Sequence, residues 1–132
     1  MMDKLNEEVK VFIAAQSMVF ISTADAGGNC DSSFRAGDVG FVQVVDDKTL
    51  LYPEYRGNGV YASLGSITEN PHIGLFFVDF VMHGIGLHVN GSAQIIHETH
   101  PSDPRAERFV KVTVDEAYIH CSKHIPPSQT IT

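Results

Sequence analysis

The sequence predicts a small, mostly antiparallel β-barrel with flanking helices, built as a single domain over residues 1–132. The chain is 43% hydrophobic and 19% charged, which at this length supports one domain with a real core and leaves no room for a second. Turn signals recur about every ten residues and separate the β-rich runs. Connections of that length are too short for the crossover helices of a parallel sheet, and about six strands in so short a chain favour a barrel.

The first predicted element is a short amphipathic helix over residues 4–15, because apolar residues recur there at the i, i+4, i+7 spacing. Those residues are Leu5, Val9 and Phe12. A β-rich run over 18–21 comes next and ends at the turn signal of residues 25–29, Asp-Ala-Gly-Gly-Asn. We expect a hairpin whose return strand is Asp31–Arg35.

A second hairpin joins the apolar runs 41–45 and 49–52 through the polar turn 46–48. A second helix follows, and Asn70-Pro71 ends it because the residue before a proline is pushed out of the helical region. The apolar residues that mark one face of this helix are Val60, Leu64 and Ile67.

The rest of the chain reads as three further strands. Residues 73–80 are nearly all apolar and predict a strand buried on both faces. The next strand, 87–96, contains Gly91, which indicates a bulge or a close backbone approach. Apolar and polar residues alternate over 109–114 as a last strand, and we expect a short helical turn over 115–120.

Charge and composition limit the classes of partner that the protein can have. Nine Lys and Arg against sixteen Asp and Glu give a net charge of −7, which opposes a broad grip on a phosphate backbone, so we expect no nucleic-acid partner. No run approaches the roughly 18 apolar residues of a membrane span, so no membrane partner is expected. The two cysteines, Cys30 and Cys121, are too few for a disulfide framework, and with an acidic N-terminus they fit a cytoplasmic protein.

The segment Tyr55-Arg56-Gly57-Asn58, directly before the second helix, is the first candidate for chemistry. A helix N-terminus presents unpaired N–H groups that suit a phosphate. Glycine allows close backbone approach, Arg56 offers a planar fork of donors, and Ser63 adds a hydroxyl one turn into the helix. The alternative is a plain turn in which Asn58 caps the helix.

The second candidate is Ser33 with Arg35 on the predicted return strand, where a hydroxyl and a cation could form another phosphate arm. The alternative is an ordinary exposed arginine. The pairs His97/His100 and His120/His124 have tolerable metal-ligand spacing, but no acidic or Cys partner completes either, so we expect no metal. No residue is identified as a catalytic base.

With these residues in view, the chain resembles the pyridoxamine 5′-phosphate oxidase-like proteins, which are FMN-binding split barrels. The resemblance covers Phe20 to about Cys121 and rests on the order of several blocks. Those blocks are Phe20-Ile21-Ser22-Thr23-Ala24-Asp25, Asp31-Ser32-Ser33-Phe34-Arg35-Ala36-Gly37, Gly40-Phe41-Val42-Gln43-Val44 with Asp46-Asp47-Lys48-Thr49-Leu50, Tyr55-Arg56-Gly57-Asn58, Ser63-Leu64-Gly65-Ser66-Ile67, Asn70-Pro71-His72-Ile73-Gly74-Leu75-Phe76-Phe77, Leu87-His88-Val89-Asn90-Gly91-Ser92-Ala93 and Glu116-Ala117-Tyr118-Ile119-His120-Cys121-Ser122-Lys123.

The resemblance implies a six-stranded antiparallel split β-barrel that forms a homodimer and binds one FMN in each of two clefts between the subunits. The positions that hold the flavin phosphate in the family correspond to Arg35, Arg56, Gly57, Asn58 and Ser63. Ser33 and Tyr55, which lie beside them in the sequence, complete the predicted cofactor site.

Three departures separate this chain from the true pyridoxamine phosphate oxidases. They carry Ser-Arg-Lys at the helix entry, where this chain has Asn58-Gly59-Val60, and Arg-Gln where it has Ile85-Gly86. Their C-terminal extension ends with a substrate-contacting Trp and Arg, whereas this chain has no Trp. Pyridoxamine phosphate is therefore not the expected substrate.

The leading hypothesis is a flavin-dependent oxidoreductase that acts on a small molecule. In flavin chemistry the protein mainly orients the cofactor and excludes water. The absence of an identified pair of catalytic residues is therefore compatible with this hypothesis. Three alternatives stay open: a non-catalytic flavin-binding protein that serves as an electron carrier or in stress, the same fold with deazaflavin or haem, and a structural dimer without a cofactor.

Overall fold

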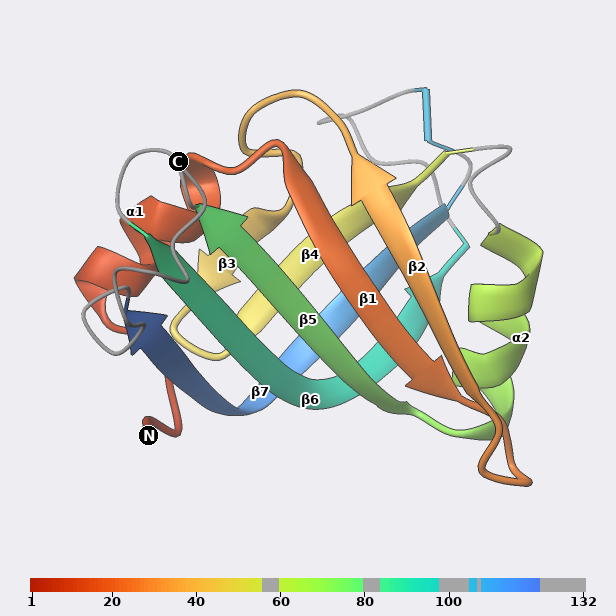
Figure 1. Ribbon diagram of the computed structural model, residues 1–132. Helices are drawn as coiled ribbons and strands as arrows, with labels where there is room; N and C mark the ends of the chain where they lie inside the picture. The colour runs from red at the N-terminus through yellow and green to blue at the C-terminus, as the bar shows by residue number, and fades with distance from the viewer. Residues whose placement is uncertain (56–59, 80–83, 98–104, 107, 122–132) are drawn as a thin grey trace, which may run out of the picture.

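The computed structural model describes residues 1–55, 60–79, 84–97, 105–106 and 108–121. These residues form two helices and seven strands, with four strands between the helices and three after the second helix (Figure 1). They are α1 (Glu7–Ala14), β1 (Met18–Ala24), β2 (Cys30–Ala36), β3 (Gln43–Asp46), β4 (Thr49–Glu54), α2 (Val60–Glu69), β5 (His72–Asp79), β6 (Ile85–Ile96) and β7 (Arg108–Cys121).

All the strands belong to one strongly curled sheet in the order β2-β1-β5-β6-β7-β4-β3 (Figure 1). Every neighbouring pair is antiparallel, as the short connections predict. The protein is thus a mostly β, antiparallel split barrel, and the predicted fold class is confirmed. The described residues form seven strands instead of the predicted six, and the shortest of these is the four-residue edge strand β3.

The first hairpin forms where the sequence predicts it. β1 and β2 pair from Met18↔Ala36 to Ala24↔Cys30. Asp25 closes the turn, because its carboxylate accepts a hydrogen bond from the backbone N–H of Asn29 at 2.9 Å. Gly28 has a φ of 84°, a left-handed conformation that costs glycine little.

The helical turn expected over 115–120 is wrong, because these residues continue β7. They pair with β6 as far as Cys121↔Ile85. Met2 also exchanges two backbone hydrogen bonds with Ala117, at 2.8 and 2.9 Å. Because the backbone N–H and C=O groups of this segment form hydrogen bonds on both sides of the strand, the segment stays extended and does not form a helical turn.

Gly91 marks a β-bulge, as predicted. The register between β6 and β7 shifts between Asn90 and Gly91. A Cβ atom at position 91 would lie 2.1 Å from the carbonyl oxygen of Thr113, so only glycine fits this close backbone approach.

The expectation that β5 is buried on both faces is wrong for this chain. Ile73, Leu75 and Phe77 point into the barrel and are at most 4% exposed, whereas Phe76 on the other face is only half-buried. The alternation shows that one face of β5 belongs to the core and the other to the outer surface of the sheet.

The core fills the barrel interior, and α1 packs beside it. Asn6 caps α1, since its side-chain oxygen accepts a hydrogen bond from the backbone N–H of Val9 at 2.9 Å. Val9 and Ile13 of α1 are buried in the core. Lys10 ties α1 to the β3–β4 turn through Asp47. α2 lies at the other side of the barrel, near the turn between β1 and β2 (Figure 1).

Candidate functional site

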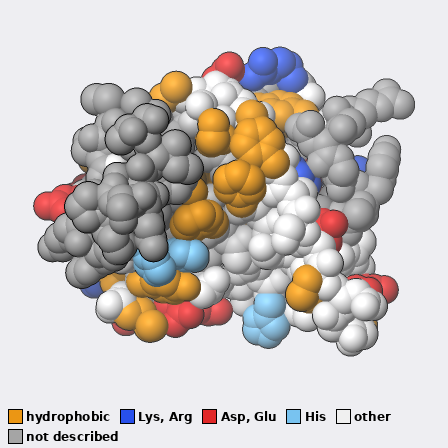
Figure 2. Space-filling view, viewed as in Figure 1, with side chains coloured by type: hydrophobic (Ala, Val, Ile, Leu, Met, Phe, Trp, Pro, Cys, Tyr) orange, Lys and Arg blue, Asp and Glu red, His pale blue; other side chains and the backbone are white. Residues whose placement is uncertain are grey.

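Five aromatic rings form one row across the outer face of the sheet. Sheet register places Phe34, Phe20, Phe76, His88 and Tyr118 directly opposite one another on β2, β1, β5, β6 and β7. We call these five residues the aromatic row. Figure 2 shows hydrophobic side chains gathered on this face, with histidine beside them.

Three pairs of neighbouring rings in the aromatic row contact each other. The ring centroids of Phe20 and Phe34 are 5.4 Å apart, and those of Phe76 and His88 are 4.3 Å apart. His88 stacks almost parallel on Tyr118 at 4.6 Å, with 7° between the ring planes. These separations are typical of favourable aromatic pairs, and of the three pairs only His88 and Tyr118 lie nearly parallel, since the other two pairs are tilted by 56° and 34°.

The row is open to solvent at its β2 end. Phe20 is 46% exposed and Phe34 is 49% exposed, and Met18 beside them is 41% exposed. These exposed large apolar side chains on one face make this end of the row a candidate interaction surface.

His120, at 4.9 Å from His88, adds a second imidazole to this face. Burial lowers the pKa of His88 below its usual value, and the neighbouring His120 lowers it further. The aromatic face therefore favours the neutral form of His88.

A second row, made of polar residues and one glycine, runs beside the aromatic row. Ser32, Ser22, Gly74, Asn90 and Glu116 are opposite one another on the same five strands. Asn90 donates a hydrogen bond from Nδ2 to Glu116 Oε1 at 2.9 Å. A Cβ atom on Gly74 would lie 3.3 Å from Asn90 Oδ1, so the glycine leaves a notch in this row.

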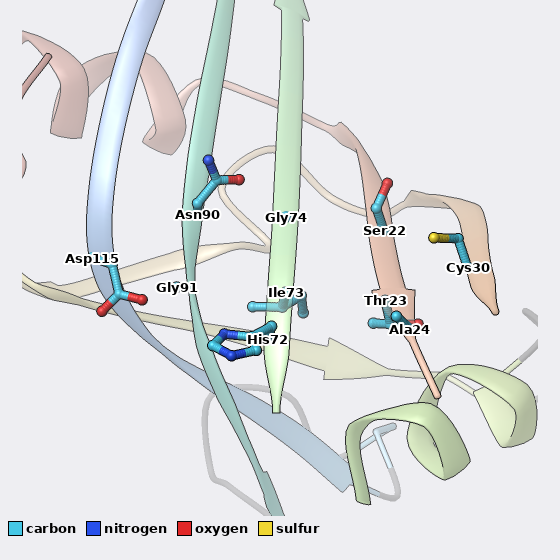
Figure 3. A pocket seen from close by; sticks show the side chains of 10 residues that line it. All are labelled: Ser22, Thr23, Ala24, Cys30, His72, Ile73, Gly74, Asn90, Gly91 and Asp115. Carbon is cyan, nitrogen blue, oxygen red and sulfur yellow. The ribbon is translucent and has the colours of Figure 1, made fainter. Parts of the chain in front are cut away.

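The notch belongs to an open groove of about 350 Å³ at the end of the sheet near the β1–β2 turn (Figure 3). Its lining mixes small, polar and apolar side chains. The lining residues are Ser22, Thr23, Ala24, Cys30, His72, Ile73, Gly74, Asn90, Gly91 and Asp115. Among the described residues, no three His, Cys, Asp or Glu side chains group closely enough to hold a metal ion.

Arg35 is not on the outer face. It points into the barrel, is 1% exposed, and forms a two-point ion pair with Glu54. Arg35 Nε donates to Glu54 Oε1 at 2.9 Å and Nη2 donates to Oε2 at 3.2 Å. Burial lowers the pKa of Arg35, but the hydrogen bonds and the charge of Glu54 outweigh this and raise it above the usual value. Arg35 is therefore charged, and the two-point contact places its guanidinium against the Glu54 carboxylate group.

Several buried polar atoms on the inner face have no hydrogen-bond partner among the described residues. They are Thr23 Oγ1, Ser33 Oγ, Arg35 Nη1 and Tyr52 Oη. Burial, and then the charge of Glu54, raise the pKa of Tyr52 well above its usual value, so its hydroxyl keeps its proton. Unpaired buried donors are costly in a folded protein, and a bound group that accepts from them removes that cost.

The structure describes only some of the predicted site residues at the start of the second helix. Tyr55 follows β4 directly and is half-buried. The guanidinium carbon of Arg105 lies 5.5 Å from the centre of its ring, and Arg105 Nη2 pairs with Asp38 Oδ2 at 3.0 Å. Arg56, Gly57 and Asn58 lie outside the described residues, as does the side chain of Ser63.

The elements that carry the predicted site nevertheless gather at one place. The end of β2, the end of β4 and the start of α2 lie at the same end of the barrel (Figure 1). Arg35 is next to last in β2 and Glu54 is last in β4, so their ion pair joins these two strand ends.

The residues at this end fit a phosphate group in the kind of donor they offer. Ser33 Oγ and Arg35 Nη1 are buried and unpaired among the described residues, and both can donate to a phosphate oxygen. They do not supply its charge, because the Arg35–Glu54 pair is neutral as a whole. A phosphate bound here would need its positive charge from cations other than Arg35.

Sequence reasoning missed Glu54, Arg105 and the aromatic row. Glu54 carries no local signal, since a carboxylate at the end of a strand is most often exposed. Phe34 and Arg35 have the reverse of their usual orientations, because the apolar Phe34 faces outward and the charged Arg35 faces inward. The period of two along β2 is the one available signal, as it places Asp31, Ser33 and Arg35 on one face.

Within the described part of the chain, no helix is both long enough and apolar enough to cross a membrane.

The fold and these sites define an antiparallel split-barrel protein with an aromatic outer face and a donor-bearing strand end. Residues 5–131 match the family described as pyridoxamine 5′-phosphate oxidase. The chain therefore belongs to the pyridoxamine 5′-phosphate oxidase family. No protein of curated function matches it.

Several solved structures share the fold of this chain. HupZ from Group A Streptococcus superposes with a TM-score of 0.69 at 21% identity, covering 89% of this chain and 95% of that one. A Clostridium acetobutylicum protein related to general stress protein 26 gives a TM-score of 0.61 at 15% identity, with 86% of each chain covered. An F420 reductase gives 0.56 at 15% identity, covering 86% and 98%. At these identities the likeness shows the fold alone.

Proposed function

We propose that the protein binds FMN between two copies of the chain and acts as a flavin-dependent oxidoreductase on a small molecule. Family membership is one support for this proposal. The observation that carries it is the combination, on β2, of an outward ring at Phe34 and inward unpaired donors at Ser33 and Arg35. A flavin nucleotide has the matching parts, a flat ring system and a phosphate.

Different residues are proposed to bind the ring system and the phosphate of the cofactor. The aromatic row offers exposed aromatic rings on which a ring system can pack. Ser33 and Arg35 Nη1 offer donors for phosphate oxygens, and Arg56, Gly57, Asn58 and Ser63 are proposed to join them. Bound FMN would supply the redox chemistry, while the protein binds it, orients it and excludes water.

A second copy of the chain is the proposed cover for the aromatic row. Phe20 and Phe34 are nearly half exposed, and aromatic residues are enriched in protein interfaces. Pairing two such faces would also enclose a ligand that lies on them and keep it from water.

The first experiment is a visible absorbance and fluorescence spectrum of the purified protein, before and after incubation with excess FMN and desalting. We expect a retained flavin spectrum at one flavin per subunit. Arg56→Ala should weaken FMN binding roughly tenfold or more, because a charge-assisted phosphate contact is lost. A wild-type protein that stays colourless after reconstitution would rule out the FMN site.

A deazaflavin on the same fold is the second candidate, favoured by the structural match to an F420 reductase. The same titration with coenzyme F420 in place of FMN separates the two, because each chromophore has its own absorbance band. Saturable binding of F420 together with rejection of FMN would replace the first proposal by the second. If the protein binds FMN, oxidation of NADH or NADPH is the next assay, and a flavin that does not turn over would indicate an electron carrier.

A further inference from the structure

The proposed phosphate site lacks a described positive charge of its own. Glu54 already neutralises Arg35, and the chain as a whole carries a net charge of −7. A phosphate monoester has close to two negative charges near neutral pH. A cation other than Arg35 is therefore needed where the ends of β2 and β4 meet.

Arg105 lies at this place. Its guanidinium is 5.5 Å from the ring centre of Tyr55, the residue that directly follows β4. Its Nη2 atom pairs with Asp38 Oδ2 at 3.0 Å, and Asp38 lies two residues beyond the end of β2. Arg105 thus joins the segment before β7 to both strand ends that carry the proposed site.

Two hollows adjoin the Arg105–Asp38 pair. One, of about 240 Å³, is lined by Ala36, Gly37, Asp38, Tyr55 and Arg105. The other, of about 150 Å³, also includes Asp38, Tyr55 and Arg105 in its lining. The arginine therefore stands beside open space that a ligand group can enter.

The ion pair itself is exposed, with 64% of the Arg105 side chain and 81% of the Asp38 side chain open to solvent. An exposed pair of this kind holds only weakly, because water competes for both charges. A phosphate accepts two parallel hydrogen bonds from the guanidinium fork and carries more charge than a carboxylate. A phosphate can therefore compete with Asp38 for the guanidinium of Arg105.

We propose that Arg105 is an exchangeable phosphate-binding residue: it pairs with Asp38 in the ligand-free protein and turns to the phosphate monoester of the bound ligand. Asp38 acts as the internal competitor, and its charge also repels the phosphate. This inference rests on the proposed function for the identity of the ligand, while the chemistry it names is that of any phosphate monoester.

The test is a fluorescence titration of the apo-protein with FMN, and with riboflavin as the analogue without phosphate. Arg105→Gln should weaken FMN binding about tenfold or more. Asp38→Asn should tighten it about two- to fivefold, since the competitor is removed. Arg105→Lys should fall between wild type and Arg105→Gln, because charge remains while the planar fork is lost. Riboflavin affinity should be the same in all four proteins.

Asp47→Asn is the matched control. It removes the acidic partner of another surface ion pair, that of Lys10, and changes the net charge by the same amount. FMN affinity in Asp47→Asn should equal that of wild type. Tightening in Asp47→Asn equal to that in Asp38→Asn would show a general charge effect and overturn the role of Asp38.

A thermal-shift series with inorganic phosphate separates this inference from the proposed function. Phosphate should raise the melting temperature of wild type, raise that of Asp38→Asn further, and leave Arg105→Gln unmoved. If wild type rejects FMN yet shows this pattern, the FMN proposal fails and the phosphate site stands. If FMN binds with equal affinity to wild type and Arg105→Gln, or phosphate stabilises both equally, the inference about Arg105 is overturned.

Discussion

Arg35 and Glu54 form an ion pair inside the barrel between two strands that are not neighbours in the sheet. β2 is one edge of the strand order, and β4 lies next to the opposite edge. The pair, with Nε–Oε1 at 2.9 Å and Nη2–Oε2 at 3.2 Å, therefore crosses the barrel interior and ties the two ends of the curled sheet together.

Glu54→Gln should destabilise the fold strongly, because it leaves the guanidinium of Arg35 buried without its counter-charge. Loss of one partner from a buried pair typically costs about 3–5 kcal/mol. Urea unfolding gives the free energy of unfolding of this variant. The double variant Arg35→Met/Glu54→Leu should regain most of the loss, since neither charge is then buried. A double variant no more stable than Glu54→Gln would contradict this account.

Phe20→Glu and Phe34→Glu should each yield a folded monomer. Both side chains are nearly half exposed, so a carboxylate there reaches water in the free chain but would be buried between two apposed faces. Sedimentation velocity gives the oligomeric state and circular dichroism the fold. Val11→Glu on α1, at a residue that is 68% exposed, is the control and should leave the dimer intact. Dimers in both phenylalanine variants would place the interface elsewhere.

Lowering the pH should destabilise the protein through His88. Its pKa lies below the usual 6.5 because burial and then His120 disfavour the imidazolium. The unfolded chain therefore binds the proton first, and the unfolding free energy falls as the pH drops below about 6.5. His120 lies 4.9 Å from the His88 ring and adds to the cost of a positive charge there.

Unfolding curves measured at pH 7 and pH 5.5 test this point. His88→Phe keeps an aromatic ring in the row and should lose less stability between the two pH values than wild type does. Equal losses in the two proteins would assign the pH dependence to other groups.

Gly91→Ala should destabilise the protein, since the new Cβ atom would lie 2.1 Å from the Thr113 carbonyl oxygen and would force the backbones apart. Such overpacking costs about 1–3 kcal/mol or more. Gly65→Ala is the matched control: its Cβ atom meets nothing within 4 Å on α2, and alanine favours a helix by up to about 1 kcal/mol. Chemical denaturation of both variants should give opposite signs. A neutral Gly91→Ala would show that the bulge can relax.

Local signals explain which parts of the fold can be predicted. The helix α1, the turn closed by Asp25 and the bulge at Gly91 are each encoded by neighbouring residues, through apolar spacing, turn chemistry and the glycine itself. The extension of β7 to Cys121 depends on its pairing with β6 and Met2, which lie far away in the sequence.

The candidate site depends even more on distant pairings. The aromatic row joins five residues from five strands, and only the register of the whole sheet shows that Phe34 and Tyr118 belong to one line. The burial of Arg35 follows from Glu54, whose own sequence context gives no hint of it. The residue types of Ser33 and Arg35 are thus enough to make them candidates, whereas the direction in which their side chains point is known only from the fold.

The strand order also constrains how the chain can fold. The β1–β2 and β3–β4 hairpins, both from the first half of the sequence, flank the β5-β6-β7 meander on opposite sides. An isolated two-stranded hairpin is only marginally stable in water. Each hairpin therefore becomes stable only when the meander is present to pair with it. During synthesis the early hairpins must wait for the ribosome to release the last strand, and this dominance of non-local pairing predicts slow folding that completes after translation.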